Sequence, residues 1–176
     1  MEGSLLRCGM SAVVFDFSFE VDATLEAVAA LHHDTKVLHA LTPPVIILRV
    51  HRSGPMAEGM EAEFTMWMGP LPMRWHVIHE DVGLRGFTDR ALSGPCKSWR
   101  HRHSFVPLTG ERSSGAPGEA VLEGARTPRV RIDEHIELEH HPGVRGLLTR
   151  ALFARPNLWI LFAYRRWQTR RLLRVR

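Results

Sequence analysis

Residues 94–105 read Gly94-Pro95-Cys96-Lys97-Ser98-Trp99-Arg100-His101-Arg102-His103-Ser104-Phe105, and the architecture of the chain can be worked out from this stretch. Two aromatic rings and two imidazoles recur at every second position: Trp99, His101, His103 and Phe105. In a β-strand this spacing places all four on one face and the arginines on the other. An imidazole that points inward needs a hydrogen-bond partner. We therefore predict a strand whose inner face lines a pocket.

Six other segments carry strand patterns, and turn residues separate most of them. Between residues 12 and 21, for example, Val13, Phe15 and Phe17 alternate with polar side chains. The predicted strands are 12–21, 45–51, 60–68, 73–80, 84–92, 94–107 and 129–138. Because the connections between most neighbours are short, we predict an antiparallel sheet.

Helical patterns lie on either side of this run of strands. Asp22-Ala23-Thr24 offers a helix start, and a second short helix from residue 34 or 35 ends before Thr42-Pro43-Pro44. Residues 144–152 and 158–173 are amphipathic, and Pro156 between them should kink the helix or serve as the first residue of its second part. The long C-terminal helix must bury its apolar stripe, so we place it against the concave side of a strongly curved seven-stranded sheet. The predicted class is α+β.

Composition indicates one globular domain. The 176 residues are 44% hydrophobic and 24% charged, and no apolar run is long enough to cross a membrane. We predict an N-terminal extension over 1–10, a domain over 11–176, and a flexible loop insertion over 109–127, which is rich in Gly, Ser, Pro and Glu. Residues 1–10 lack the features of a secretory signal, so we expect a cytoplasmic protein whose two cysteines are free thiols.

The C-terminal region is strongly basic. Residues 142–176 contain nine arginines and no acid. Such an asymmetry can indicate nucleic acid or an anionic membrane. No nucleic-acid-binding module accompanies it, so we expect a solvated helix face, no nucleic-acid partner and at most a weak contact with an anionic membrane surface.

The order of elements resembles the START-like superfamily, also called the helix-grip or SRPBCC superfamily, and within it the bacterial ligand-binding and polyketide cyclase/dehydrase-like branch. The matching residues are Leu41-Thr42-Pro43-Pro44, Gly69-Pro70-Leu71-Pro72, Trp75, Phe87-x-Asp89, Gly94-Pro95, Trp99-x-His101-x-His103-x-Phe105 and Leu161-Phe162-x-Tyr164-Arg165. The resemblance covers about residues 11–174. It implies a helix-grip fold with an apolar cavity between the sheet and the last helix.

The resemblance, together with the residues that the strand alternation places on the concave face, gives two functional hypotheses. The first is the binding of a medium-sized hydrophobic molecule, such as a lipid or polyketide, in the cavity. The second is a cyclase or dehydratase that acts on a polyketide-like carbonyl compound. The expected ligand-binding residues are Phe64, Met66, Trp75, Trp99, Phe105, Ile132, Ile136, Leu158 and Phe162. No oligomeric state follows from the sequence.

Three polar residues are predicted to share the concave face: His101, His103 and Glu134. They can serve as acid/base groups or as a polar anchor for a ligand. A purely structural role, in which they satisfy one another, remains an alternative. We predict that Asp89 forms a surface ion pair with Arg100 or Arg102, and that the pairs His32-His33 and His140-His141 are exposed.

The same three residues could bind zinc. Two observations argue against a metal: no second inward acid is evident to orient the imidazoles, and Arg100 and Arg102 add positive charge nearby. The superfamily resembled is also not typically metal-dependent. The prediction is therefore no metal and no cofactor.

Overall fold

The computed structural model describes residues 12–108 and 128–174. The predicted N-terminal extension and the predicted loop over 109–127 lie outside the described residues. The elements, in chain order, are β1 (Val13–Asp22), α1 (Leu25–His33), α2 (Val37–Ala40), β2 (Ile46–Arg52), β3 (Glu61–Met68), β4 (Leu71–Gly83), β5 (Gly86–Ser93), β6 (Ser98–Pro107), β7 (Arg129–Glu139), α3 (Gly143–Leu152) and α4 (Arg155–Arg174).

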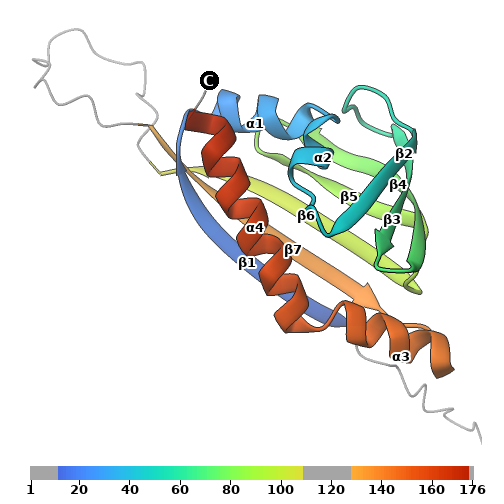
Figure 1. The fold of residues 1–176 in the computed structure, drawn as a ribbon. Coiled ribbons are helices and arrows are strands. Elements are labelled where there is room, and N and C mark those ends of the chain that lie inside the picture. Colours follow the sequence, from blue (N-terminus) through green and yellow to red (C-terminus); the bar gives the residue numbers. More distant parts are fainter. Residues whose placement is uncertain (1–11, 109–127, 175–176) are drawn as a thin grey trace, which may run out of the picture.

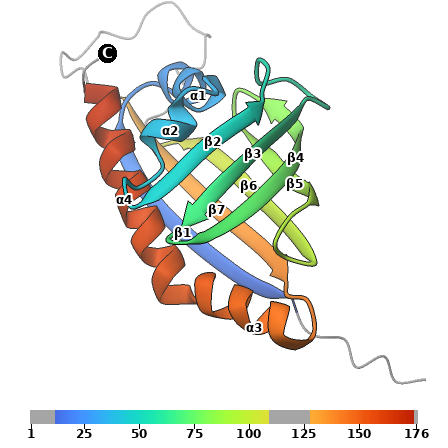
Figure 2. The same ribbon diagram turned by 45° about the vertical axis from the view of Figure 1, so that its right-hand side comes forward.

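The strands form one seven-stranded antiparallel sheet with the order β1-β7-β6-β5-β4-β3-β2. The sheet curves strongly, and the helices lie on its concave side (Figures 1 and 2). Helix α4 runs along β1 and β7, while α1 and α2 cover the end of the sheet that lies opposite α3 (Figure 1). The predicted α+β architecture, with two short helices after the first strand and a long C-terminal helix, is confirmed.

The first two helices follow from local sequence. The hydroxyl of Thr24 accepts a hydrogen bond from the backbone N–H of Ala27 at 3.2 Å and caps α1. The carboxylate of Asp34 then accepts from the N–H of Lys36, and the resulting turn delays α2 to Val37. Helix α2 is therefore shorter than the predicted segment, which began at residue 34 or 35.

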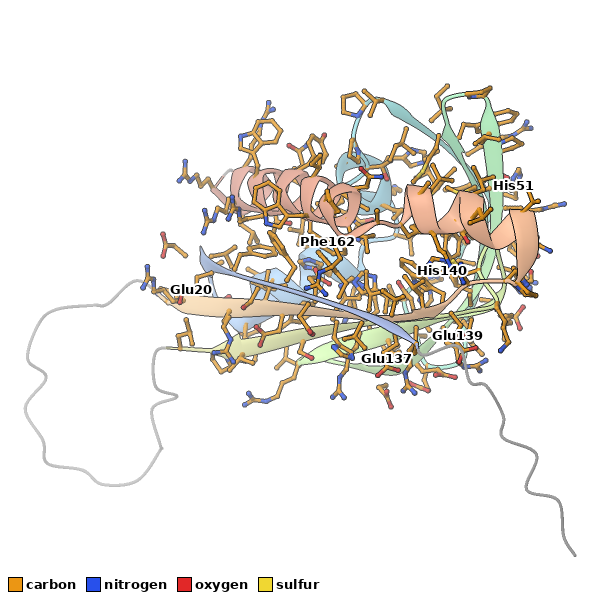
Figure 3. The ribbon with its side chains drawn as sticks, turned by 90° about the horizontal axis from the view of Figure 1, so that it is seen from below. Glu20, His51, Glu137, Glu139, His140 and Phe162 are labelled. Atoms are coloured by element: carbon orange, nitrogen blue, oxygen red, sulfur yellow. The ribbon has the colours of Figure 1, made fainter. Side chains whose placement is uncertain are left out.

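Helices α3 and α4 are separated by a short break. Pro156 lies in the first turn of α4, where its missing N–H costs no helical hydrogen bond. The side chain of Asn157 donates to the carbonyl of Ala151 at 2.8 Å and satisfies the end of α3. Leu158 and Phe162 are almost completely buried against the sheet. Figure 3 shows Phe162 in the layer between α4 and the sheet, whereas Glu137 lies on the other side of the sheet.

The arginines of α4 have more specific contacts than a solvated face would give them. The side chain of Arg155 donates to the carbonyl of Val14, and that of Arg170 donates to the carbonyl of Glu20 at 2.9 and 3.0 Å. Strand β1 is an edge of the sheet, so both arginines satisfy carbonyls that no strand pairs. Within the described residues, none of the helices is long and apolar enough to span a bilayer.

Candidate functional site

The concave side of the sheet encloses a cavity of about 160 Å³, bounded by β2 to β6, the segment around α2, and α4. Most of its wall is apolar. Five of the predicted ligand-binding residues line it: Phe64, Met66, Trp75, Trp99 and Phe162. Thr35 and Ser53, at least partly exposed, mark the opening between the α1–α2 connection and the end of β2. One end of the cavity is polar, and the sheet register explains why.

Two rows of residues cross the sheet at this polar end. In one row, His79, Asp89 and His101 lie opposite one another on β4, β5 and β6. In the next row, His103 on β6 lies opposite Glu134 on β7. Opposite residues of paired strands share a face. Three histidines and two carboxylates therefore meet on the concave side, inside a largely apolar enclosure.

Glu134 is the centre of this group, and its side chain is almost completely buried. Because a carboxylate only accepts, Nε2–H of His101 donates to Glu134 Oε2, and the two atoms are 2.8 Å apart. Nδ1 of His103 lies 2.7 Å from the same oxygen, at an angle too oblique for an aligned hydrogen bond. The predicted association of these three side chains is present in the structure.

Asp89 completes the group, and the prediction of a surface ion pair with Arg100 or Arg102 is wrong. Its Oδ1 atom lies 2.6 Å from His79 Nδ1, and its Oδ2 atom lies 3.7 Å from His103 Nε2. The reason is parity. Phe87 points into the core, and Asp89 is two residues further along the same strand, so it points the same way.

Burial and neighbouring charges set the protonation states. Burial lowers the pKa of His103, but the carboxylates of Glu134 and Asp89 outweigh it and raise that pKa to about 9. Burial and the charge of His103 together lower the pKa of His101 to about 4. Although burial opposes ionisation of Glu134 and Asp89, their histidine neighbours hold both pKa values well below the usual range. At neutral pH His103 is the charged imidazole, and His101 is neutral.

Two further residues at this end were not anticipated from the sequence. His32 was predicted to be exposed, yet its ring is buried, packs against the ring of Phe105 in a tilted arrangement and contacts the carbonyl of Val28 through Nδ1 at 2.9 Å. Its helical spacing with Leu25 and Val28 was the available signal. Arg165, which follows Phe162 by three residues on the inner stripe of α4, lines the cavity. Burial lowers the pKa of Arg165, and Glu134 and Asp89 oppose that effect.

The remaining predicted residues lie elsewhere. Phe105 and Ile132 pack in the hydrophobic core beneath α1, and Ile136 and Leu158 pack in the core beneath α4. They hold the elements that form the cavity and are not part of its wall. His140, predicted to be exposed, is buried, and its Nδ1 atom lies 2.9 Å from the hydroxyl of Thr149.

The polar end also has the donor atoms of a metal site. One ring nitrogen of His101, one of His103 and a carboxylate oxygen of Asp89 lie within 4.8 Å of one another. This differs from the set considered from the sequence, in which Glu134 was the third ligand.

Comparison with known proteins fixes the fold. No family model and no curated protein matches the chain. A START superfamily protein from Mycobacterium smegmatis superposes with a TM-score of 0.61 and 10% identity over 92% of this chain and 97% of that one. The chain has the START-like helix-grip fold.

Plant proteins also share this helix-grip fold. Norcoclaurine synthase from Thalictrum flavum, in a complex with dopamine and hydroxybenzaldehyde, superposes with a TM-score of 0.60 and 17% identity, over 98% of this chain and 95% of that one. Major latex-like protein 151 from Panax ginseng superposes with a TM-score of 0.59 and 9% identity, over 92% and 97% of the two chains. At these identities the helix-grip fold is the common property, and function must be argued from the site.

Proposed function

We propose that the chain binds a small, mostly apolar molecule in the cavity, with a polar end that faces His101, His103 and Asp89. The observation that carries this proposal is an apolar enclosure closed at one end by buried, charged side chains. Such pockets use apolar walls for affinity and a few polar groups for orientation.

The size of the cavity limits the ligand. Its volume of about 160 Å³ is close to the roughly 150 Å³ of an engineered protein cavity that holds benzene. The ligand that fits is therefore about one aromatic ring, smaller than the medium-sized molecule expected from the sequence, unless it protrudes through the opening. The solved complex of norcoclaurine synthase with dopamine and hydroxybenzaldehyde supports a ring of this size in the same fold.

A series of para-alkyl phenols tests this proposal by calorimetry on metal-free protein purified without detergent. We expect binding of phenol and its short-chain derivatives, and weaker binding once the alkyl chain exceeds the cavity. Ala62→Leu fills the cavity and should weaken binding by about tenfold or more. Ala151→Leu, at an exposed position of α3, is the matched control and should bind as the wild type does. If no phenol binds, or if both variants bind equally, the proposal is wrong.

The contact of two imidazoles with one carboxylate supports a second candidate, acid/base catalysis on a bound carbonyl compound by a cyclase or dehydratase. His101 donates from Nε2, and its Nδ1 atom has no hydrogen bond to another described residue. That lone pair can accept a proton from a carbon next to a carbonyl group. Exchange of the α-protons of 4-phenyl-2-butanone in D2O, followed by NMR, should be faster with wild type than with His101→Gln. Equal rates would exclude this chemistry for this ketone, and His76→Gln is the control.

A further inference from the structure

We propose that Asp89, His101 and His103 form a binding site for one divalent transition-metal ion, and that Glu134 orients both imidazoles from behind. The proposal goes beyond ligand binding in the cavity and does not depend on which molecule the cavity holds. It is carried by the positions of four buried or half-buried side chains on three adjacent strands.

The donor atoms are already close to the spacing that a metal needs. Bonds of about 2.1 Å to nitrogen and oxygen in a tetrahedron place neighbouring ligand atoms about 3.4 Å apart. Nε2 of His103 and Oδ2 of Asp89 are 3.7 Å apart. One ligand atom from each of the three residues lies within 4.8 Å of the other two, so side-chain rotations can bring the donors onto one ion.

The second argument is the way Glu134 contacts the two rings. A histidine that ligates a metal commonly donates its other ring N–H to a carboxylate, which fixes the tautomer and the orientation of the ring. Glu134 Oε2 accepts a hydrogen bond from Nε2 of His101 at 2.8 Å and contacts Nδ1 of His103 at 2.7 Å, there at an oblique angle. This leaves Nδ1 of His101 and Nε2 of His103 as the metal-binding nitrogens. Asp89 is supported in the same way, because its Oδ1 atom lies 2.6 Å from Nδ1 of His79.

Charge is the third argument. A metal ion must displace the proton that His103 carries at neutral pH. Once both imidazoles are neutral, the carboxylates of Asp89 and Glu134 give the group a charge of −2, which a divalent cation neutralises. The mixed nitrogen and oxygen donors favour Zn²⁺, Co²⁺, Ni²⁺ or Fe²⁺ over Mg²⁺ and Ca²⁺. Arg165 lines the same cavity and competes as a cation, so we expect moderate affinity.

The structure also removes one objection raised by the sequence. The absence of a second inward acid argued against a metal, but Asp89 points inward together with Glu134. Arg100 and Arg102 are exposed and do not line the cavity. Three protein ligands leave a fourth position open toward the cavity for water or the polar end of a ligand.

Tag-free protein, stripped with a chelator, is titrated with Co²⁺ and followed by visible absorption, and Zn²⁺ binding is measured by calorimetry. We expect one equivalent of metal per chain. Asp89→Asn and His103→Gln should abolish binding. Glu134→Gln keeps all three ligands but loses the orienting carboxylate, so we expect about 10- to 100-fold weaker binding. His76→Gln, which alters a histidine–carboxylate pair on the outside of the sheet, should bind as the wild type does.

The proposal is overturned if the wild type binds no metal, if Asp89→Asn binds as tightly as the wild type, or if only His76→Gln weakens binding. Circular dichroism shows whether each variant is folded. If His103→Gln does not fold, the nearly isosteric Asp89→Asn variant decides. A rise in melting temperature with Zn²⁺ that occurs in the wild type and not in Asp89→Asn supports the site independently. Because phenol binding is measured without metal, failure of one proposal is separable from failure of the other.

Discussion

His32 shows at the residue scale how burial makes stability depend on pH. Burial lowers its pKa from 6.5 to about 4, although the carbonyl of Val28 acts in the opposite direction. The unfolded chain takes up this proton below pH 6.5, whereas the folded chain keeps the ring neutral down to about pH 4. Stability from this group is therefore complete above pH 6.5 and falls as the pH drops toward 4, by up to about 3 kcal/mol.

We predict that His32→Leu reduces the loss of stability between pH 7 and pH 5, measured by urea unfolding at each pH. The carboxyl groups contribute little to the change in stability between pH 7 and pH 5. The stabilisation that Asp89 and Glu134 provide is lost only below the ordinary pKa of a carboxyl group. His101 still gives the variant some pH dependence of the same sign. His39→Leu, at an exposed position, is the control and should keep the pH dependence of the wild type. If the stability of the His32→Leu variant depends on pH as that of the wild type does, the conclusion that the His32 ring is buried and neutral is wrong.

The residue scale also shows what the sequence could and could not predict. The strict alternation around His101 and His103 placed both rings inward, and the same parity identified Glu134. Asp89 was misassigned because arginines on the next strand offered an obvious partner, although its spacing from Phe87 already placed it inside. Which nitrogen faces which carboxylate depends on side-chain rotamers and strand twist, and neither is encoded in a periodic pattern.

At the scale of elements, the close approach of β5 to β6 depends on Gly86. Its φ of +135° is unfavourable for residues with a side chain, and a Cβ there would lie 1.9 Å from the carbonyl oxygen of His103. Gly86 pairs with Ser104, so any side chain would push β5 away from the strand that carries both site histidines.

We predict that Gly86→Ala lowers the free energy of unfolding by about 3 kcal/mol or more, because backbone strain and a backbone clash add. Gly83→Ala, at the other side of the same hairpin, has open space around the added carbon and should change stability far less. Urea unfolding of the two variants measures the difference. Equal stabilities would show that β5 and β6 can separate without cost.

Element boundaries were predictable where local chemistry sets them. Thr24 marks a helix start through capping, and the structure confirms it. Pro156 was predicted to kink the helix or to begin its second part, and it lies in the first turn of α4, one residue after the start. The start of α2 was not predicted correctly, since the turn formed by Asp34 competes with the helix. Trp167 lies within the predicted amphipathic segment 158–173 but is exposed, because the helix presents only a narrow face to the sheet.

At the scale of the whole molecule, the arrangement of strands and helices was predictable from the sequence, whereas the interior cavity was not. The succession of elements was sufficient to predict the sheet and the helix on its concave side, because short connections between strands allow few topologies. The cavity volume was not predictable, since it is the small space left after many side chains have packed. The residues that line the cavity were likewise predicted only in part. Phe162 and Trp75 line the cavity, whereas Ile136 and Leu158 were predicted to do so and pack in the core.

The basic C-terminal region provides a test at the same scale. Arg155 and Arg170 are engaged by carbonyls of β1, and Arg165 faces the cavity, so only part of the positive charge is available to a surface. An arginine close to an anionic membrane contributes about 1 kcal/mol, and this attraction is confined to a screening length of roughly 8 Å at physiological salt.

We therefore predict weak binding to vesicles that contain phosphatidylserine at low salt, and no measurable binding at physiological salt, in a co-sedimentation assay. Neutral vesicles should not bind at either salt concentration. The double substitution Arg171→Gln/Arg174→Gln should abolish the low-salt binding, because both side chains are exposed on the last turn of α4. Arg100→Gln/Arg102→Gln removes the same charge from the outer face of the sheet and serves as the control. Tight binding that persists at physiological salt would instead make the C-terminal helix a membrane-docking element and would favour a lipid as the ligand of the cavity.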